Sequence, residues 1–459
     1  MRKVLVSTII VISFFCMSTF AFEGDGSKSN PYVITDAAEF SDFAALVNQG
    51  VEGYDTAYYE LWSDIDFDGV TYVMPGTASH PFKGTFDGNG YRLCNIKLMN
   101  AADEYVSSND FTVGAFGYAE NAMFEDLIIE NMTVVISNST IKSKLNLGLI
   151  AGKLAKTSNE KKSGFIRCST AGSITVVYNG ADVIVGGICG NVSNTAANST
   201  VVLENCRSDA DITVTVKKNV YAGGLCGRIK SSATGADFSV DRSLFTGSIT
   251  VTDKAMFSIS GGIVGEAGID NEHGEWMSLF ASSSAPVTNC YFSGTLNGNG
   301  TWQYDGSICG YVNEVSIGNC YVEKDSFYCT NSTYCRGGSI IEASADEVFF
   351  KGNLGFDFAN DWEMRSLYPS LKYAHAPKAK VKNDRLFVSF GDVGDSFAVV
   401  ALYDEDNRLL NAEIKNHKAG EPVTCSVDVG NSVFSYKVVF LKDLKSIVPI
   451  VECVEGELS

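Results

Sequence analysis

Short apolar runs bounded by glycine recur through the middle of the chain, and one such run is repeated six times. Each copy is a small apolar cluster between glycines, as in VGGICG at 185–190 and AGGLCG at 222–227. The copies end at Gly117, Gly152, Gly190, Gly227, Gly265 and Gly310, which gives steps of 35, 38, 37, 38 and 45 residues. A near-constant step of this length indicates a repeat architecture in which each copy belongs to one coil.

A second apolar block follows each copy, and its composition is typical of β-strands. The block is rich in Val, Ile, Thr and Leu, is bounded by Gly, Asn, Asp and Ser, and shows no helical periodicity. Its core-facing anchors are Leu127, Cys168, Cys206, Ser243, Cys290 and Cys320. Short strands repeated at a fixed period predict an all-β solenoid, most economically a right-handed parallel β-helix.

Stacked coils place equivalent residues about 4.8 Å apart, so the cysteines of successive copies should form columns in the core. One predicted column holds Phe116, Ala151, Cys189, Cys226, Val264 and Cys309, and a second holds Cys168, Cys206, Cys290 and Cys320. Apolar residues replace cysteine in these columns, as core packing permits, and a buried thiol behaves as a small hydrophobe. Poor torsions disfavour disulfides between stacked coils, and zinc ligand spacing is missing. Outside the columns, Cys329 and Cys335 are the predicted disulfide.

The N-terminal part of the chain predicts a cap and a short strand. Residues 37–48 form one apolar helical face, with Asp36 as the N-cap and Gly50 ending the helix, and this helix should cover the open core. The stretch DIDFDG begins like a calcium loop at Asp64, Asp66 and Asp68, but Pro75 stands where the twelfth ligand belongs. Alternation favours a strand with outward acids over a calcium site.

The repeat stops before Asp346, and the pattern then changes twice. The aromatic stretch 354–373 is predicted to close the stack, because a solenoid needs capped ends. Longer alternating strands from about residue 376 predict a small β-sandwich. The predicted domains are therefore a signal peptide at 1–21, a capped β-helix at 22–375 and a β-sandwich at 376–459.

Charge and the N-terminus set the expected compartment. Arg2 and Lys3 precede a short apolar run that ends in small residues, which predicts a secretory signal cut after Ala21. Loss of those two cations takes the formal charge from −19 to −21. A secreted acidic monomer is expected, with no nucleic-acid partner, no membrane insertion after signal removal, and no cofactor or metal.

These blocks resemble GLUG-motif repeat proteins of bacteria, which are secreted or cell-surface β-helix proteins. The resemblance is carried by the G-G-[IL]-x-G copies, by GDGSKSNPYVIT and FKGTFDGNGY, and by GFDFANDWEMRSLYPSLKY, across residues 22–375. The tail, with VVALYDEDNRLLNAEI, is similar to a β-sandwich of exported clostridial proteins. The resemblance implies an architecture and supplies no catalytic residues.

Candidate chemistry is sparse outside the repeats. The longest insertion between a final glycine and the next anchor is 266–287, and its possible ligand-binding residues are Asp270, Glu272, His273 and Trp276. Trp276 could stack on a sugar ring or pin its own loop, whereas Trp302 and Tyr304 are assigned to the other connection, on a different face. The sequence thus favours a non-enzymatic secreted or cell-surface adhesion protein that binds a glycan or a surface protein. The alternative is a polysaccharide lyase or hydrolase on the same fold.

Overall fold

The structure is a computed structural model. It describes residues 22–99, 110–138, 141–253, 255–269, 286–313, 315–323, 326, 338–341, 345–365, 367–372, 378–382, 385–390, 396–417, 423–428, 435–441 and 454–457. The predicted signal peptide, the predicted Cys329–Cys335 disulfide and the predicted ligand-binding residues Asp270, Glu272, His273 and Trp276 lie outside these residues.

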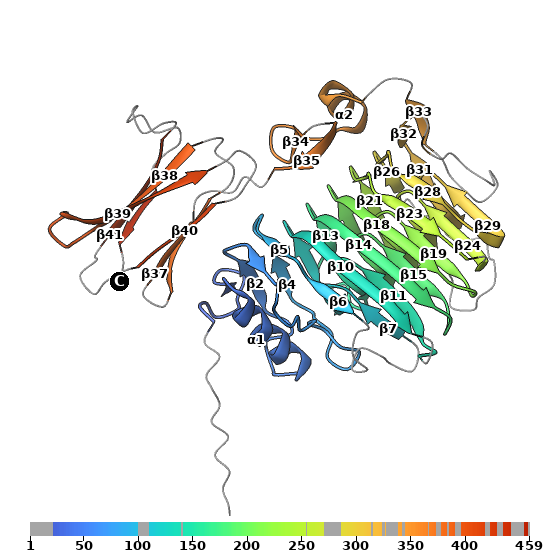
Figure 1. Ribbon diagram of the computed structural model, residues 1–459, viewed down its shortest axis with the longest axis horizontal. Helices are drawn as coiled ribbons and strands as arrows, with labels where there is room; N and C mark the ends of the chain where they lie inside the picture. The colour runs from blue at the N-terminus through green and yellow to red at the C-terminus, as the bar shows by residue number, and fades with distance from the viewer. Residues whose placement is uncertain are drawn as a thin grey trace, which may run out of the picture.

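The described residues confirm the all-β solenoid, with parallel strands stacked in four long sheets (Figure 1). The nine-stranded sheet consists of β1 (Tyr32–Ile34), β2 (Tyr58–Leu61), β4 (Thr85–Asp87), β9 (Met123–Glu125), β13 (Ser163–Ile166), β17 (Thr200–Glu204), β21 (Asp237–Asp241), β26 (Pro286–Thr288) and β31 (Ser316–Gly318). The twelve-stranded sheet consists of β3 (Ile65–Asp66), β5 (Arg92–Cys94), β6 (Lys97–Met99), β10 (Ile128–Asn138), β14 (Ser169–Tyr178), β18 (Arg207–Thr215), β22 (Leu244–Phe245), β23 (Ser248–Val251), β27 (Tyr291–Phe292), β28 (Thr295–Asn297), β32 (Tyr321–Glu323) and β33 (Ser339–Ile341).

Two further sheets have six described strands each and are named here after their last strands. The β29 sheet consists of β7 (Asp110–Val113), β11 (Lys144–Gly148), β15 (Val183–Gly186), β19 (Val220–Gly223), β24 (Ala255–Gly261) and β29 (Gly300–Gly306). The β30 sheet consists of β8 (Phe116–Glu120), β12 (Ala151–Lys156), β16 (Cys189–Asn194), β20 (Cys226–Ser231), β25 (Val264–Ile269) and β30 (Cys309–Asn313). Each glycine-rich copy therefore contributes one strand to each of these two sheets.

The strand register follows the spacing of the repeat. In the β30 sheet, Phe116 pairs with Ala151, Ala151 with Cys189, Cys189 with Cys226, Cys226 with Val264 and Val264 with Cys309. These five pairings have the same steps as the glycines in the sequence. All six side chains are buried in one continuous core cluster. Periodicity alone therefore sets the register of the stack.

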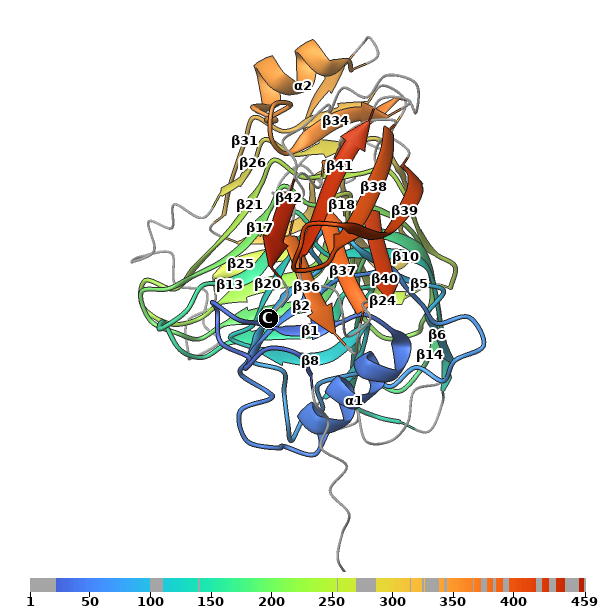
Figure 2. The same cartoon turned by 90° about the vertical axis from the view of Figure 1, so that its left-hand side faces the viewer.

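The N-terminal end is capped as the sequence predicts. Helix α1 (Ala37–Asn48) begins at Asp36, whose carboxylate accepts a hydrogen bond of 2.9 Å from the backbone N–H of Glu39. Phe40 and Phe43 are fully buried, and their rings lie 6.4 and 6.1 Å from that of Phe116. Figure 2 views the stack from the side of these first coils, where α1 lies. The helix thus supplies aromatic surface to the open core.

The DIDFDG stretch adopts the predicted strand. Ile65 and Phe67 are buried at 1% and 2% exposure, and the three acids that alternate with them face outward. Each carboxylate contacts a different residue of the next coil: Asp64 accepts from Arg92, Asp66 from Asn95 and Asp68 from Lys97. The three acids are therefore engaged separately and do not converge on one point.

The segment predicted to close the stack lies along its flank instead. Residues 345–372, which we call the clasp, contain α2 (Glu347–Leu354) and the hairpin of β34 (Trp362–Arg365) and β35 (Tyr368–Leu371). Figure 1 shows these elements beside the stacked strands rather than beyond β29. The physical reason lies in the outward positions Leu244 and Tyr291, which are apolar and are buried by the clasp.

The C-terminal strands are antiparallel, as predicted for the sandwich. One described sheet is formed by β36 (Lys378–Lys382), β37 (Arg385–Phe390) and β40 (Val423–Asp428). The other is formed by β38 (Ser396–Tyr403), β39 (Leu409–His417), β41 (Ser435–Leu441) and β42 (Val454–Glu457). In the described part of the chain, no helix is long and apolar enough to cross a membrane.

Candidate functional site

The glycine-rich motif is a corner between two strands and not a single strand. In VGGICG, strand β15 ends at Gly186 and strand β16 begins at Cys189, so Gly187 and Ile188 form the turn. The repeated motif therefore joins the β29 sheet to the β30 sheet in every coil. Sequence periodicity finds the repeat but does not reveal the change of direction inside it.

The two consecutive glycines of the motif are required by different neighbours. A Cβ on Gly223 would lie 1.9 Å from the carbonyl oxygen of Cys226 and 2.7 Å from the nitrogen of Gly265. A Cβ on Gly224 would instead lie 2.1 Å from the carbonyl oxygen of Gly262 in the next coil and 2.3 Å from the ring of Phe245, on the inner face of the twelve-stranded sheet. The first glycine thus allows the two strands to meet closely, and the second allows the corner to point into the body of the solenoid.

Because the corner points inward, the outer faces of the two sheets turn toward each other. We call the facing side chains the seam. The β29 sheet contributes Thr112, Asn146, Ile184, Tyr221, Ile259 and Tyr304, and the β30 sheet contributes Tyr118, Lys153, Asn191, Arg228, Glu266 and Tyr311. Ile184 is fully buried although it lies outside the main core cluster, which is the mark of this second packed layer.

The first coils of the seam are linked by polar side chains. Asn191 Nδ2 donates to Asn146 Oδ1 at 3.1 Å, and Asn146 Nδ2 donates to Asp110 at 2.9 Å. Lys153 Nζ donates to Asp110 at 2.7 Å and lies 5.2 Å from the ring centroid of Tyr118. Burial alone would raise the pKa of Asp110, but the hydrogen bond and the charge of Lys153 hold it below its usual value.

The middle of the seam combines an aromatic ring with alternating charges. The guanidinium of Arg228 lies 4.5 Å from the ring centroid of Tyr221, and its Nε donates to Glu266 at 2.6 Å. Lys230 contacts the other oxygen of the same carboxylate at 3.3 Å. Burial raises the pKa of Tyr221 to about 12, so its hydroxyl stays neutral at physiological pH. This part of the seam offers ring faces and polar groups together.

The last coil presents aromatic side chains. The rings of Phe257 and Trp302 are stacked, with centroids 6.4 Å apart and an interplanar angle of 19°. Tyr304 and Tyr311 meet edge to face across the seam at 5.8 Å. Trp302 is 58% exposed, the largest ring among the exposed apolar side chains of the described residues. The seam therefore ends beside the exposed indole of Trp302, with Phe257, Tyr304 and Tyr311 half-buried next to it.

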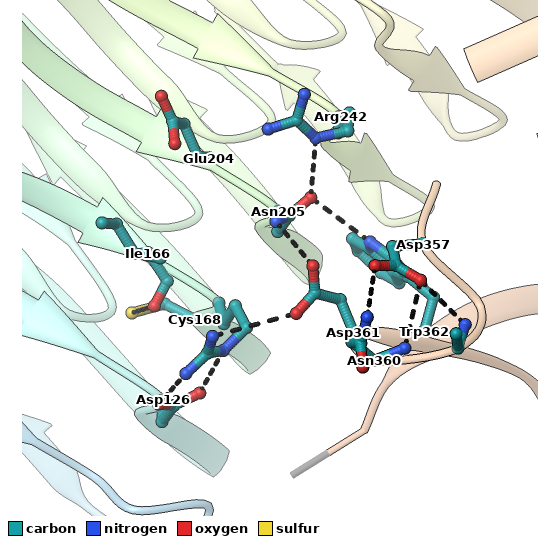
Figure 3. Close-up of polar contacts among 12 residues, drawn as sticks. Asp126, Ile166, Cys168, Glu204, Asn205, Arg242, Asp357, Asn360, Asp361 and Trp362 are labelled. Atoms are coloured by element: carbon teal, nitrogen blue, oxygen red, sulfur yellow. Dashed lines mark hydrogen bonds and ion pairs between the residues drawn. The ribbon is translucent and has the colours of Figure 1, made fainter. Parts of the chain in front are cut away.

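A second outer surface of the solenoid is occupied by the clasp (Figure 3). Asn205 Nδ2 donates to Asp361 at 3.2 Å, while Asn205 Oδ1 accepts from Trp362 Nε1 at 3.4 Å. Arg167 contacts Asp361 at 3.8 Å and also pairs with Asp126 of the preceding coil. Burial raises the pKa of Asp361, and the neighbouring Arg167 works against that rise.

The polar residues under the clasp share one backbone feature. Each is the residue directly before a core anchor, and each has a positive φ that turns the chain from the nine-stranded to the twelve-stranded sheet. The φ values of 48°, 49°, 52°, 45°, 54° and 51° belong to Asp126, Arg167, Asn205, Arg242, Asn289 and Asn319. The second apolar block of each repeat is therefore divided into two strands at this residue. Only Asn289 and Asn319 are joined amide to amide among these six, at 2.6 Å.

The candidate residues singled out in the sequence lie in different kinds of position in the structure. The stacked cysteines Cys168, Cys189, Cys206, Cys226, Cys290, Cys309 and Cys320 are all buried at 4% exposure or less. Four of these thiols, in the anchor column, contact carbonyl oxygens of the preceding coil, as Cys168 does with Phe124 at 3.5 Å. Trp302 and Tyr304 are not in a connection: they lie within strand β29 and face the seam. Their spacing of two residues, which places two side chains on the same face of a strand, could have indicated this position.

The described residues offer little for covalent chemistry. Within them, no group of three or more His, Cys, Asp or Glu side chains is arranged to hold a metal ion. Asp305 has a pKa raised by burial, but it is fully covered and accepts a hydrogen bond from Gln303. Glu266 is 8% exposed and is paired with two cations. Neither acid is placed like a general acid that meets a substrate.

Fold and seam together define an extended parallel β-solenoid with a long polar and aromatic outer surface. No family model matches the sequence. The chain is similar to halomucin of Haloquadratum walsbyi, at 25% identity over 192 residues, and to a "putative Gly-rich membrane protein" of Evansella cellulosilytica, at 26% over 125 residues. These matches cover 39% and 25% of this chain but 2% and 13% of those much longer proteins.

Among solved structures, the chain is similar to the crystal structure of a "putative immunoglobulin A1 protease" from Bacteroides ovatus. The TM-score is 0.54 at 18% sequence identity, and the match covers 77% of this chain and 95% of that one. At this identity the likeness shows the solenoid fold.

Proposed function

We propose that the protein is a secreted or cell-surface β-solenoid of the GLUG-motif kind that binds glycan without altering it chemically. The observation that carries the proposal is the seam, which runs along six successive coils. Its partly exposed amide, charged and aromatic residues are Tyr118, Lys153, Asn191, Tyr221, Arg228, Tyr304 and Tyr311. Repeat proteins use extended surfaces of this kind for binding, because each coil adds the same positions again. The predicted signal peptide and the similarity to halomucin support an extracellular setting.

The absence of catalytic action is part of the proposal. Cleavage of sugars requires two carboxyl groups on either side of the scissile bond, one of them an accessible acid. In the described residues, Asp305 is sealed inside the last coil and Asp361 is held under the clasp by Asn205. Within the same residues, no hydrogen bond joins the imidazole of His80 to a serine or cysteine, as a hydrolytic nucleophile would need.

A glycan array with the purified mature protein tests the binding, and an assay for new reducing ends or unsaturated products on the bound glycans tests the chemistry. We expect saturable binding and no product. Product formation would replace this proposal with a polysaccharide lyase or hydrolase. Incubation with immunoglobulin A1 under the same conditions provides the third arm, and cleavage fragments there would favour a protease.

A further inference from the structure

Trp302 occupies an unusual position in the stack. It lies on β29, the last strand of its sheet in the described chain, and it pairs in register with Phe257 of the preceding coil. Phe257 therefore covers one face of the indole, while no described strand covers the other face. With 58% of its surface exposed, the indole presents a flat apolar face to solvent at the end of the seam.

We propose that this face of Trp302 docks a neutral pyranose ring, and this inference rests on the proposed glycan-binding function. A sugar ring has one face of C–H groups that packs on an indole and a rim of hydroxyls that seek hydrogen bonds. Tyr304 follows two residues later on the same face of β29, about 7 Å away, and Tyr311 stands opposite. A ring on Trp302 therefore has phenol groups and the polar seam beside it.

Charge selects a neutral sugar over an acidic one. The chain has a formal charge of −19, so polyanionic glycans are repelled before contact. The cations nearest along the seam are committed to an acid, since Arg228 and Lys230 both contact Glu266. The same negative charge opposes docking on an anionic membrane. A stacked pair of rings is also far smaller than the surface that a stable second copy would bury.

The test compares Trp302→Ala and Trp302→Phe with a matched control, Val348→Ala. Val348 is 76% exposed but lies on α2 of the clasp, away from the seam. Binding to neutral glucans, mannans, xylans and galactans is measured by titration calorimetry, with pectin and heparin as acidic probes. We expect Trp302→Ala to weaken neutral-glycan binding about tenfold or more, Trp302→Phe to lose less, and Val348→Ala to bind like the wild type. Because Trp302 is exposed, all three variants should melt like the wild type.

Four outcomes would overturn the inference, and they separate it from the proposed function. Wild-type binding that Trp302→Ala leaves unchanged would reject Trp302 as the platform while the protein remains a glycan binder. Binding to acidic glycans alone would reject the neutral class. Failure of the wild type to bind any glycan would reject both proposals. Dimer formation or vesicle binding that is lost in Trp302→Ala would assign the ring to a second copy or to a membrane.

Discussion

The tight contact between the two six-stranded sheets can be tested at Gly223. In Gly223→Ala the new Cβ would lie 1.9 Å from the oxygen and 2.6 Å from the carbon of the Cys226 carbonyl, and 2.7 Å from the nitrogen of Gly265. All three are backbone atoms, so relief requires two strands to shift. Overpacking of this kind lowers the free energy of unfolding by about 1–3 kcal/mol. Because the neighbours here are rigid backbone atoms, we expect a loss near the upper end of that range. A loss of about 3 kcal/mol corresponds to a melting temperature lower by about 4 °C, because the roughly 350 residues of the solenoid unfold with an entropy of about 2.1 cal/mol/K each.

Gly318→Ala is the matched control, because this glycine also lies in a strand of the solenoid. Its new Cβ would meet only Thr288 Cγ2, at an ordinary 3.7 Å. We expect the free energy of unfolding of this variant to equal that of the wild type or to exceed it by about 0.4–1 kcal/mol, since alanine restricts the unfolded chain. Thermal unfolding followed by circular dichroism measures both variants. If Gly223→Ala has the same melting temperature as Gly318→Ala, the close approach of the two six-stranded sheets at Gly223 is refuted.

Three further predictions concern the thiols, the clasp and the acids of β3. Burial raises the pKa of Cys168, Cys189 and Cys290 well above the usual 9.0, so at higher pH the folded state keeps protons that the unfolded state loses. Stability should therefore be full below pH 9 and fall above it, and equal urea midpoints at pH 7 and pH 10 would contradict this. Trp362→Ala removes a buried ring stacked 4.6 Å from Phe356 and should cost the clasp about 3–5 kcal/mol. Faster hydrogen exchange confined to 345–372 is expected, and unchanged exchange would show that the ring does not hold the clasp. The melting temperature should be the same in excess calcium as in excess chelator, because Asp64, Asp66 and Asp68 each contact a different residue. A rise of several degrees with calcium would support the calcium site instead.

The register of the stack could be predicted from the sequence, whereas the seam could not. Residue spacing determines which positions stack, and the pairing of Cys189 with Cys226 follows from it. Spacing does not give the angle between consecutive strands of one coil. Val183, Ile184 and Val185 form an unbroken apolar run, which is what a strand buried on both faces looks like. That run is compatible with many arrangements. The close approach of Gly187 to Ser208, and of Gly224 to Phe245, shows which arrangement the chain adopts.

The clasp escaped prediction for a related reason. Its aromatic residues predict a cap, since sequence shows that they need burial but not which surface buries them. The receiving surface is set by the outward neighbours of the anchors, which in the later coils are Leu244, Tyr291 and Tyr321, all packed against the clasp. In an earlier coil the equivalent position is Arg207, which donates to Pro369 O and Ser370 Oγ at 2.7 Å each. A pairing between segments about 160 residues apart has no local signature.

The two outer surfaces also differ in a way that bears on function. Where the solenoid presents outward apolar residues at Leu244 and Tyr291, the chain covers them with its own clasp. At Trp302 it leaves a larger ring open. Packing of the coils does not require an aromatic ring here, because the same column is polar in the first four coils, at Asp110, Lys144, Asp182 and Asn219, and becomes aromatic at Phe257 and Trp302.

Trp302→Asn therefore restores the usual polarity of this column and should leave the fold intact. If Trp302 serves only to pack on Phe257, the variant will melt lower and bind glycan as before. If Trp302 stacks on the bound sugar, the Trp302→Asn variant will melt like the wild type and lose neutral-glycan binding. Melting temperature and affinity thus move in opposite ways under the two explanations, and a single exposed substitution distinguishes a structural role from a binding role.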